Sequence, residues 1–225
     1  MFRRNQYVCD LISQMRRLAD RYGMDTVFTT FLELSATSMA AQMDPEHREE
    51  REKQYCACAA KLDPATLDAY ASMLATLTLA ALQFKDDPHD ILGVVFHELN
   101  LHNEWKGQFF TSEHICRFMA QITIDQADVA ERERPITIAE PACGSGAMIL
   151  GTVHALAQQK VDYTSETFFV AHDIDIRCVW MAYIQLTLYG VPAVVIHGNT
   201  LTNEEWSRWV TPYAAIPFRK QQIGA

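Results

Sequence analysis

The sequence predicts an α/β protein in which a helical N-terminal domain precedes an incomplete Rossmann-like domain. Three observations support this class. Helical patterns fill the first hundred residues; a β-branched run at 136–138 leads into a glycine loop at 144–146; and further apolar runs at 167–173 and 193–196 alternate with a helical stretch. Strands that alternate with helices are typical of a parallel sheet.

We expect the helical domain to span residues 1–104 and the Rossmann-like domain to span residues 105–225. Within the first domain, apolar spacing and cap signals predict helices at 5–22, 25–43, 45–60, 64–84 and 88–102. The last three start at Asp-Pro pairs, because Asp caps a helix N-terminus and Pro fits its first position: Asp44-Pro45, Asp63-Pro64 and Asp87-Pro88.

The composition of the 225-residue chain is that of an ordinary globular protein, with 49% hydrophobic and 21% charged residues. No apolar run reaches membrane-spanning length, and the N-terminus has no apolar signal region. The six cysteines form no two-pair metal pattern, and His97 and His102 are five residues apart, so they diverge by roughly 140° around a helix. We therefore expect a cytoplasmic protein without membrane contact, metal or disulfides.

The net charge of −9 limits how this chain could hold nucleic acid. A protein that grips DNA by itself usually carries a basic face that releases counterions. Here the basic residues are scattered, apart from Arg3-Arg4 and Arg16-Arg17. If DNA is the substrate, we expect another subunit to do much of the holding.

The glycine loop and the strand before it carry the first functional signal. A strand, a glycine turn and a helix together present backbone N–H groups and a helix N-terminus to an anion. Ile149 stands where a dinucleotide fingerprint has a third glycine, so the short loop suits a carboxylate better than a pyrophosphate. Glu140 at the strand's end could accept hydrogen bonds from an ammonium group. Together these features favour S-adenosylmethionine, whose methionine end is an amino acid.

The string Glu140-Pro-Ala-Cys-Gly-Ser-Gly146 resembles motif I of the DNA adenine-N6 methyltransferases, above all that of the modification subunit of type I restriction systems. The string Gly107-Gln-Phe-Phe-Thr-Ser112 resembles their motif X, which closes over the cofactor. The resemblance implies contacts to S-adenosylmethionine from both strings. The implied residues are Phe110, Thr111, Glu140, Ala142, Gly144 and Gly146.

Two further positions follow from the next strands. Asp173 ends the second strand where an acid would accept both ribose hydroxyls, and the resemblance puts Ile174 against the adenine. Asp175 is interpreted as a cap of the following helix. At the end of the third strand the family usually carries Gly-Asp, but this chain has Asn199, whose side-chain carbonyl could still accept a hydrogen bond from the adenine amino group.

The segment that would carry catalysis is missing from the sequence. DNA amino-methyltransferases need an Asp/Asn-Pro-Pro-Tyr/Phe segment that polarises the target amine and stacks on a flipped base. The nearest string, Thr211-Pro-Tyr213, lacks the second proline and the Asp or Asn, so we assign no catalytic residue. By resemblance the chain is a truncated methyltransferase whose matched motifs end before the chemistry.

Three functions remain open. The chain could be the cofactor half of a DNA adenine methyltransferase that works with a partner, or a catalytically inactive binding protein that acts on a modification or defence system. Methylation of a small molecule or protein would suit motif I alone. We expect residues 203–219 to cover the bare edge of the first strand or to dock a protein partner or second copy there, through Trp206, Trp209, Tyr213 and Phe218.

Overall fold

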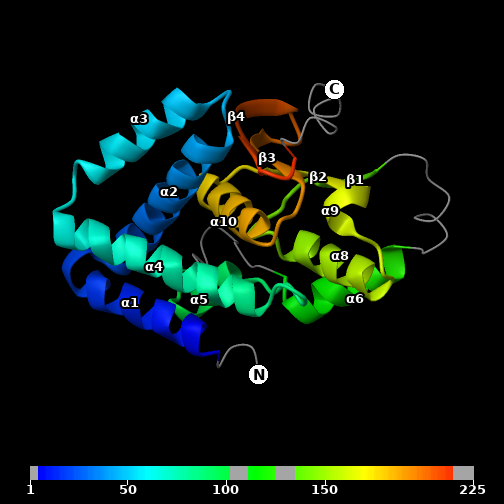
Figure 1. Ribbon diagram of the computed structural model, residues 1–225, viewed down its shortest axis with the longest axis horizontal. Coiled ribbons are helices and arrows are strands. Elements are labelled where there is room, and N and C mark those ends of the chain that lie inside the picture. Colours follow the sequence, from blue (N-terminus) through cyan, green and yellow to red (C-terminus); the bar gives the residue numbers. More distant parts are fainter. Residues whose placement is uncertain (1–4, 102–110, 125–134, 215–225) are drawn as a thin grey trace.

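The computed structural model describes residues 5–101, 111–124 and 135–214, and it confirms the predicted α/β class with a helical N-terminal part (Figure 1). Phe110 and Phe218, both named above, lie outside the described residues. The N-terminal helices are α1 (Gln6–Tyr22), α2 (Met24–Met43), α3 (Arg48–Ala59), α4 (Pro64–Gln83) and α5 (Ile91–Glu98). The later elements are α6 (Glu113–Thr123), β1 (Ile136–Glu140), α8 (Ala147–Gln158), α9 (Tyr163–Glu166), β2 (Thr167–Asp173), α10 (Ile176–Leu188), β3 (Ala193–Asn199) and β4 (Glu204–Val210).

The Asp-Pro pairs start one of the three helices assigned to them. Asp63 caps α4 by accepting a hydrogen bond from the Thr66 N–H at 2.9 Å, with Pro64 in the first turn. Asp44 instead accepts bonds from the N–H groups of Glu46 and His47, so it closes a turn and α3 begins later than predicted.

The expectation that Asp87 starts a helix at residue 88 is wrong. Asp90 is the cap of α5, because its side chain accepts a hydrogen bond from the Gly93 N–H at 2.9 Å. The carboxylate of Asp87 is held elsewhere, by Arg117 and His154. The helix is also shorter than expected and ends at Glu98.

The sheet has the strand order β1-β2-β3-β4. The first three strands are parallel, as predicted, and β4 pairs antiparallel with β3, where Val195 faces Trp209. The expectation that the segment after residue 203 covers the edge of β1 is therefore wrong for its described part. That part adds a strand at the opposite edge of the sheet, because its residues find unpaired backbone groups on β3.

Helix α10 lies between the sheet and the N-terminal helices (Figure 1). One side packs on β2, β3 and β4, and the other on α2, α4 and α5. Eight of its residues are buried, from Cys178 to Leu186. One hydrophobic cluster includes residues from α1 and α2 together with residues from β2, β3 and α10, so the core is continuous across the boundary that we predict near residue 104.

Helix α4 is, among the described residues, the one helix long and apolar enough to cross a membrane by length and composition. It packs against α1, α2, α5 and α10, and its apolar side chains at Tyr70, Met73 and Leu77 are buried. Those contacts are what a core helix of a globular protein makes.

Candidate functional site

The predicted motif I forms a tight loop between β1 and α8. Gly144 and Gly146 have positive φ angles of 53° and 95°, a backbone conformation that residues with a Cβ rarely adopt. The Gly146 N–H donates to the Cys143 carbonyl at 2.8 Å, and the Cys143 N–H donates to the His172 carbonyl of β2 at 2.8 Å. The loop is thereby fixed to the neighbouring strand, and α8 starts directly after it.

Asp173 and the glycine loop are brought together at the carboxyl ends of β1 and β2. The Gly144 N–H donates to Asp173 Oδ2 at 2.8 Å, and the Asp175 N–H donates to Asp173 Oδ1 at 2.9 Å. Burial raises the pKa of Asp173, and the neighbouring Asp175 carboxylate adds to this effect. A carboxylate can accept about four hydrogen bonds, so Asp173 can still accept one from a hydroxyl-bearing ligand.

Glu140 is the last residue of β1, at the same end of the sheet as Asp173. Its Oε1 accepts a hydrogen bond from the Ala142 N–H at 3.2 Å. Burial raises the pKa of Glu140, and the charge of Asp173 raises it further. Two carboxylates near each other in a partly buried site create a negative potential that attracts a cationic group such as an ammonium.

Ile174 and Asn199 complete the same end of the sheet. Ile174 is 62% exposed although it is large and apolar, so its side chain is available to a flat apolar ring. Asn199 Oδ1 accepts a hydrogen bond from the Leu201 N–H at 3.0 Å, which gives this carbonyl a structural role in the turn after β3. Thr200 Oγ1 donates to the Pro141 carbonyl at 2.7 Å, so this turn reaches the motif I loop.

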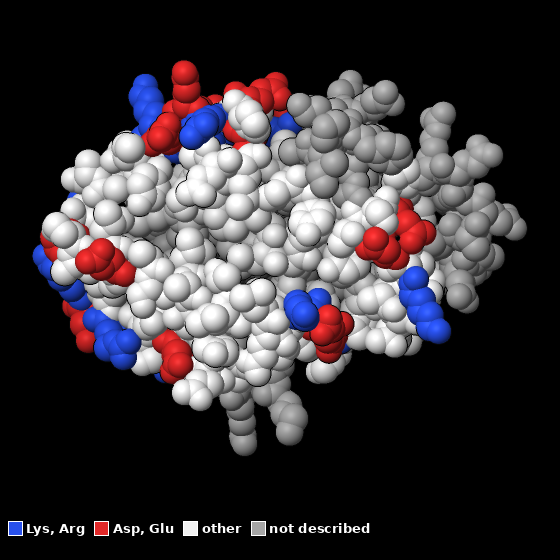
Figure 2. All heavy atoms as spheres, viewed as in Figure 1, with Lys and Arg blue, Asp and Glu red and all other residues white. Residues whose placement is uncertain are grey.

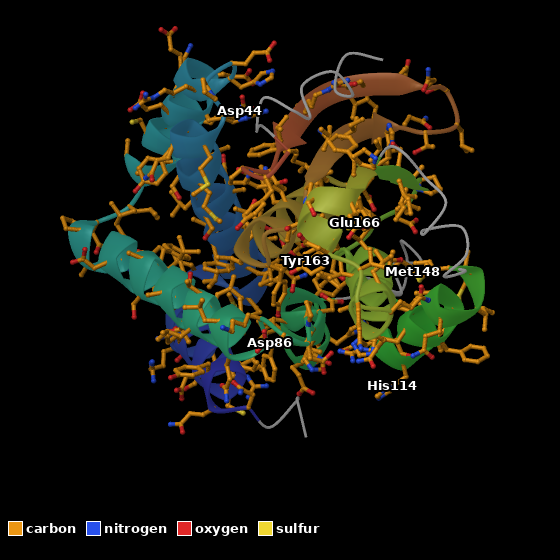
Figure 3. The ribbon with its side chains drawn as sticks, turned by 45° about the vertical axis from the view of Figure 1, so that its right-hand side comes forward. Asp44, Asp86, His114, Met148, Tyr163 and Glu166 are labelled. Carbon is orange, nitrogen blue, oxygen red and sulfur yellow. The ribbon has the colours of Figure 1, made fainter. Side chains whose placement is uncertain are left out.

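Helix α8 starts directly after the glycine loop. In Figure 3, Met148 marks the first turn of α8, and His114 marks the first turn of α6. The first N–H groups of a helix have no partner within the helix and attract anions. Thr111 lies two residues before α6 and is exposed, but its neighbour Phe110 lies outside the described residues. A contact of Thr111 with the cofactor therefore stays a prediction.

The string Thr211-Pro-Tyr213 lies at the opposite end of the sheet. Thr211 Oγ1 donates to the Val191 carbonyl at 2.7 Å and accepts from the Ala193 N–H at 2.9 Å, at the start of β3. Tyr213 packs beside Gly190, which has a positive φ. The glycine loop lies at the carboxyl ends of the parallel strands, so this string serves the structure of the turn before β3 rather than the site.

Sequence reasoning missed a buried polar network directly behind the glycine loop. Ser145 Oγ donates to Asp90 Oδ2 at 2.6 Å, and Gln185 Nε2 donates both to Asp90 Oδ1 and to the Ser145 carbonyl. The three residues are far apart in the sequence, and each has an ordinary local interpretation. A cap signal at Asp90 was the one clue available, and it gives no indication of Ser145 or Gln185.

Among the described residues, the surface drawn in Figure 2 carries no continuous basic patch. Lys and Arg side chains are separated from one another on this face, and Asp and Glu lie among them. This agrees with the net charge of −9 and gives this face little attraction for a phosphate backbone.

A glycine loop and an acid on the next parallel strand define a class of α/β proteins that hold a small ligand at the carboxyl ends of their strands. Within that class, the family model of the N-6 DNA methylases matches residues 89–218. The match covers more than half of the chain, and the chain belongs to the N-6 DNA methylase family.

Three known proteins resemble parts of the chain. It is 26% identical over 105 residues to the methylase subunit of the type I restriction enzyme MpnII from Mycoplasma pneumoniae. The aligned residues make up 45% of this chain and 18% of that relative. The chain thus matches about a fifth of that relative's length.

Two solved structures show weaker likeness. One, from Listeria monocytogenes, was solved as a class I S-adenosylmethionine-dependent methyltransferase; it has a TM-score of 0.41, 15% identity, and coverage of 89% of this chain and 55% of that one. The other is the methyltransferase subunit of a type I restriction-modification system from Streptococcus thermophilus, with a TM-score of 0.39, 14% identity, and coverage of 90% and 59%.

Proposed function

We propose that this chain binds S-adenosylmethionine and acts as the cofactor-binding part of a DNA N6-adenine methyltransferase of the restriction-modification type. The observation that carries this proposal is the hydrogen bond from the Gly144 N–H to Asp173 Oδ2, at 2.8 Å. It joins the motif I loop to the acid on the next strand, as a site for a nucleoside with an amino-acid tail requires. The match to the N-6 DNA methylase family supports the same function.

Each residue has a proposed role toward the cofactor, which when bound supplies the methyl group. Asp173 accepts hydrogen bonds from the ribose hydroxyls, and Ile174 covers one face of the adenine. Glu140 holds the ammonium group, while Ala142, Gly144 and Gly146 shape the loop that leads the carboxylate to the start of α8. Thr111 and Phe110 would close over the methionine end, and Asn199 would contact the adenine amino group.

DNA recognition and catalysis belong, in this proposal, to a partner or to a further segment of polypeptide. Among the described residues, β1 pairs with β2 alone and its other edge has no strand. Helix α6 exposes an apolar stripe nearby in the sequence, formed by Ile115, Phe118, Met119 and Ile122. An unpaired strand edge and an apolar stripe are both surfaces that proteins usually cover. We retain the domain limits of 1–104 and 105–225 and a cytoplasmic location as part of the proposal.

A partner contact through the C-terminal aromatic segment is a narrower proposal. Trp206 and Tyr213 are 51% and 42% exposed, and either a different protein or a second copy of the chain could cover them. Trp209 is buried and is excluded from such a contact. The exposed part lies beside β3, away from the edge of β1.

The alternative function is a catalytically inactive, methyltransferase-like protein that regulates a modification or defence system. One observation favours it: Thr211, in the string closest to a catalytic motif, is buried in structural hydrogen bonds at the far end of the sheet. This alternative and the first proposal share the cofactor site but differ in whether methyl transfer occurs with a partner present.

Calorimetric titration with S-adenosylmethionine tests the shared site. We expect micromolar binding that Asp173→Ala weakens by about tenfold or more, equal to about 1.4 kcal/mol. Asp175→Ala is the matched control, because Asp175 caps α10 through the Arg177 N–H, whereas the Gly144 N–H of the glycine loop donates to Asp173. No binding at millimolar ligand, or equal losses in the two variants, would overturn the proposal. Methyl transfer to DNA on addition of the cognate partner then separates the two functions.

A further inference from the structure

A buried carboxylate, that of Asp90, contacts the glycine loop through Ser145. Asp90 at the start of α5 is buried, and its Oδ2 accepts a hydrogen bond from Ser145 Oγ at 2.6 Å. Its Oδ1 accepts bonds from the Gly93 N–H and from Gln185 Nε2, both at 2.9 Å. A buried carboxylate without hydrogen-bond partners costs free energy, so these three hydrogen bonds offset the cost of burying Asp90.

Gln185 of α10 completes the network. Its Nε2 donates to the Ser145 carbonyl at 2.8 Å as well as to Asp90, and its Oε1 accepts from the Leu92 N–H at 2.9 Å. Ser145 is therefore held by its hydroxyl and by its backbone carbonyl at once. Helices α5 and α10 both reach the loop through this one residue.

The start of α5 is built to leave room for the carboxylate. A Cβ on Gly93 would overlap Asp90 Oδ2, so a glycine at this position lets the Asp90 side chain fold back over the helix. The interaction with Ser145 depends on that folded-back position. A glycine inside a helix costs stability, and here its position has an identifiable packing reason.

Ser145 stands between the two glycines with positive φ, Gly144 and Gly146. A loop with two such residues has many accessible conformations in the absence of contacts. Asp173 holds the Gly144 N–H on one side, and Asp90 with Gln185 holds Ser145 on the other. The loop is thus fixed from two directions before any ligand arrives, which reduces the entropy lost on binding.

We propose that Asp90 is a positioning residue of the cofactor site: through Ser145 it sets the glycine loop in the conformation that receives the methionine end of S-adenosylmethionine. This inference rests on the proposed function for the identity of the ligand. By this proposal, the residue that caps α5 in the helical part of the chain affects a site formed at the end of the sheet. Asp90 acts through Ser145 and touches no ligand itself.

The chemistry of the network allows a conservative replacement. Asn at position 90 keeps an oxygen that accepts from Gly93 and Gln185, and its amide can donate to Ser145 Oγ, since a hydroxyl accepts as well as donates. Burial raises the pKa of Asp90, so the neutral amide also resembles the form that burial favours. Asp90→Ala removes all three bonds, whereas Asp90→Asn retains the pattern.

Calorimetry with S-adenosylmethionine tests the proposal on Asp90→Ala, Asp90→Asn and Asp63→Ala. The last is the matched control, because Asp63 caps α4 in the same way but has no contact with the loop. Circular dichroism first establishes that each protein is folded. We then expect Asp90→Ala to weaken the binding of S-adenosylmethionine by about tenfold. Asp90→Asn should restore it to within about threefold, and the Asp63 variant should bind as the parent does. Parent-like binding by Asp90→Ala, or a failure of Asn to restore it, overturns the proposal.

Hydrogen exchange in the ligand-free protein separates this proposal from the proposed function. Backbone N–H groups over 143–148 should exchange about tenfold faster in Asp90→Ala than in the parent or the Asp63 control, whether or not S-adenosylmethionine binds. If the parent fails to bind but this acceleration is seen, the ligand is wrong and the positioning role stands. Equal exchange rates overturn the positioning role. If Asp90→Ala does not fold, Ser145→Ala removes the same loop bond with a smaller change and has the same expected outcomes.

Discussion

The two edges of the sheet, at β4 and at β1, differ in the interactions formed by the helices near them. On the β4 side, the Arg51 guanidinium of α3 lies 3.8 Å from the centre of the Trp209 ring, which is itself 2% exposed. Tyr183 and Trp180 of α10 pack against the same indole, with ring centres at 5.5 and 6.3 Å. This side is an aromatic cluster with one buried cation over its face.

Near the β1 edge, side chains of α6 and α8 form ion pairs with residues that precede α5. Arg117 contacts Asp87 Oδ1 at 2.8 Å and Glu113 Oε1 at 2.6 Å. His154 Nδ1 lies 2.7 Å from Asp87 Oδ1, and His89 Nδ1 lies 2.6 Å from Glu113 Oε1. Five side chains from three parts of the chain form this ion cluster.

The difference shows that one edge of the sheet is finished by apolar burial and the other depends on charge. The stabilisation from apolar burial depends little on pH, whereas the stabilisation from a cluster of carboxylates depends on it strongly. The polar side is also where β1 has no second strand partner among the described residues. The candidate cofactor site lies at the carboxyl ends of β1 to β3, so both kinds of support contribute to it.

The largest expected effect comes from removing the aromatic anchor. Trp209→Ala should lower the free energy of unfolding by about 3–5 kcal/mol, because it leaves a cavity and removes the aromatic ring over which the Arg51 guanidinium lies. Trp206→Ala, on the same strand but 51% exposed, should cost less than about 1 kcal/mol. Urea unfolding at pH 7 measures both. Equal losses would mean that β4 is not anchored by its buried face.

Disrupting the ion cluster should have an intermediate effect that depends on pH. Burial alone would raise the pKa of Asp87, but the Arg117 charge and the His154 hydrogen bond outweigh it and lower that pKa. Burial alone would likewise raise the pKa of Glu113, but the interactions with His89 and Arg117 outweigh it and lower that pKa. Arg117→Met should therefore cost about 1–3 kcal/mol at pH 7, a moderate value because Asp87 is half exposed and its charge is screened.

The sign of the pH dependence follows from the lowered pKa values. Carboxylates whose pKa falls on folding stabilise the fold above their ordinary values, 3.8 for Asp87 and 4.5 for Glu113, and that stabilisation is lost as pH falls through the lowered values. The difference between the parent and Arg117→Met should thus be complete at pH 7 and shrink below about pH 4. A difference that stays constant from pH 7 to pH 3 in urea unfolding would show that Arg117 acts by packing alone.

The smallest effect is expected at the edge of β1. Thr137 is exposed on this strand, and Thr137→Lys should change the free energy of unfolding by no more than about 0.5 kcal/mol. Thr167→Lys is the control, because Thr167 faces Ile136 in the neighbouring strand and is fully buried. Thermal unfolding compares the two. A loss at Thr137 as large as that at Thr167 would show that the chain's own residues cover this edge.

Local signals in the sequence predicted the elements that depend on neighbouring residues. The strand, glycine loop and helix of motif I, strand β2 at 167–173 and the cap of α10 at Asp175 all form as predicted. A capping side chain, a positive φ at a glycine and a β-branched run each act within a few residues, so the sequence states them directly. The placement of Asp173 beside the loop follows too, because parallel strands bring their carboxyl ends together.

Only the tertiary structure decided which long-range partners the polar and aromatic residues found. The sequence does not indicate that Asp87 pairs with Arg117 while Asp90 caps α5 and contacts Ser145, since an Asp at either position could cap the helix that follows. Nor does it indicate that the segment at 204–210 pairs with β3 rather than covering β1. Strand pairing and buried hydrogen bonds depend on what the rest of the fold leaves unpaired and desolvated, a property of the assembled chain and not of any short segment.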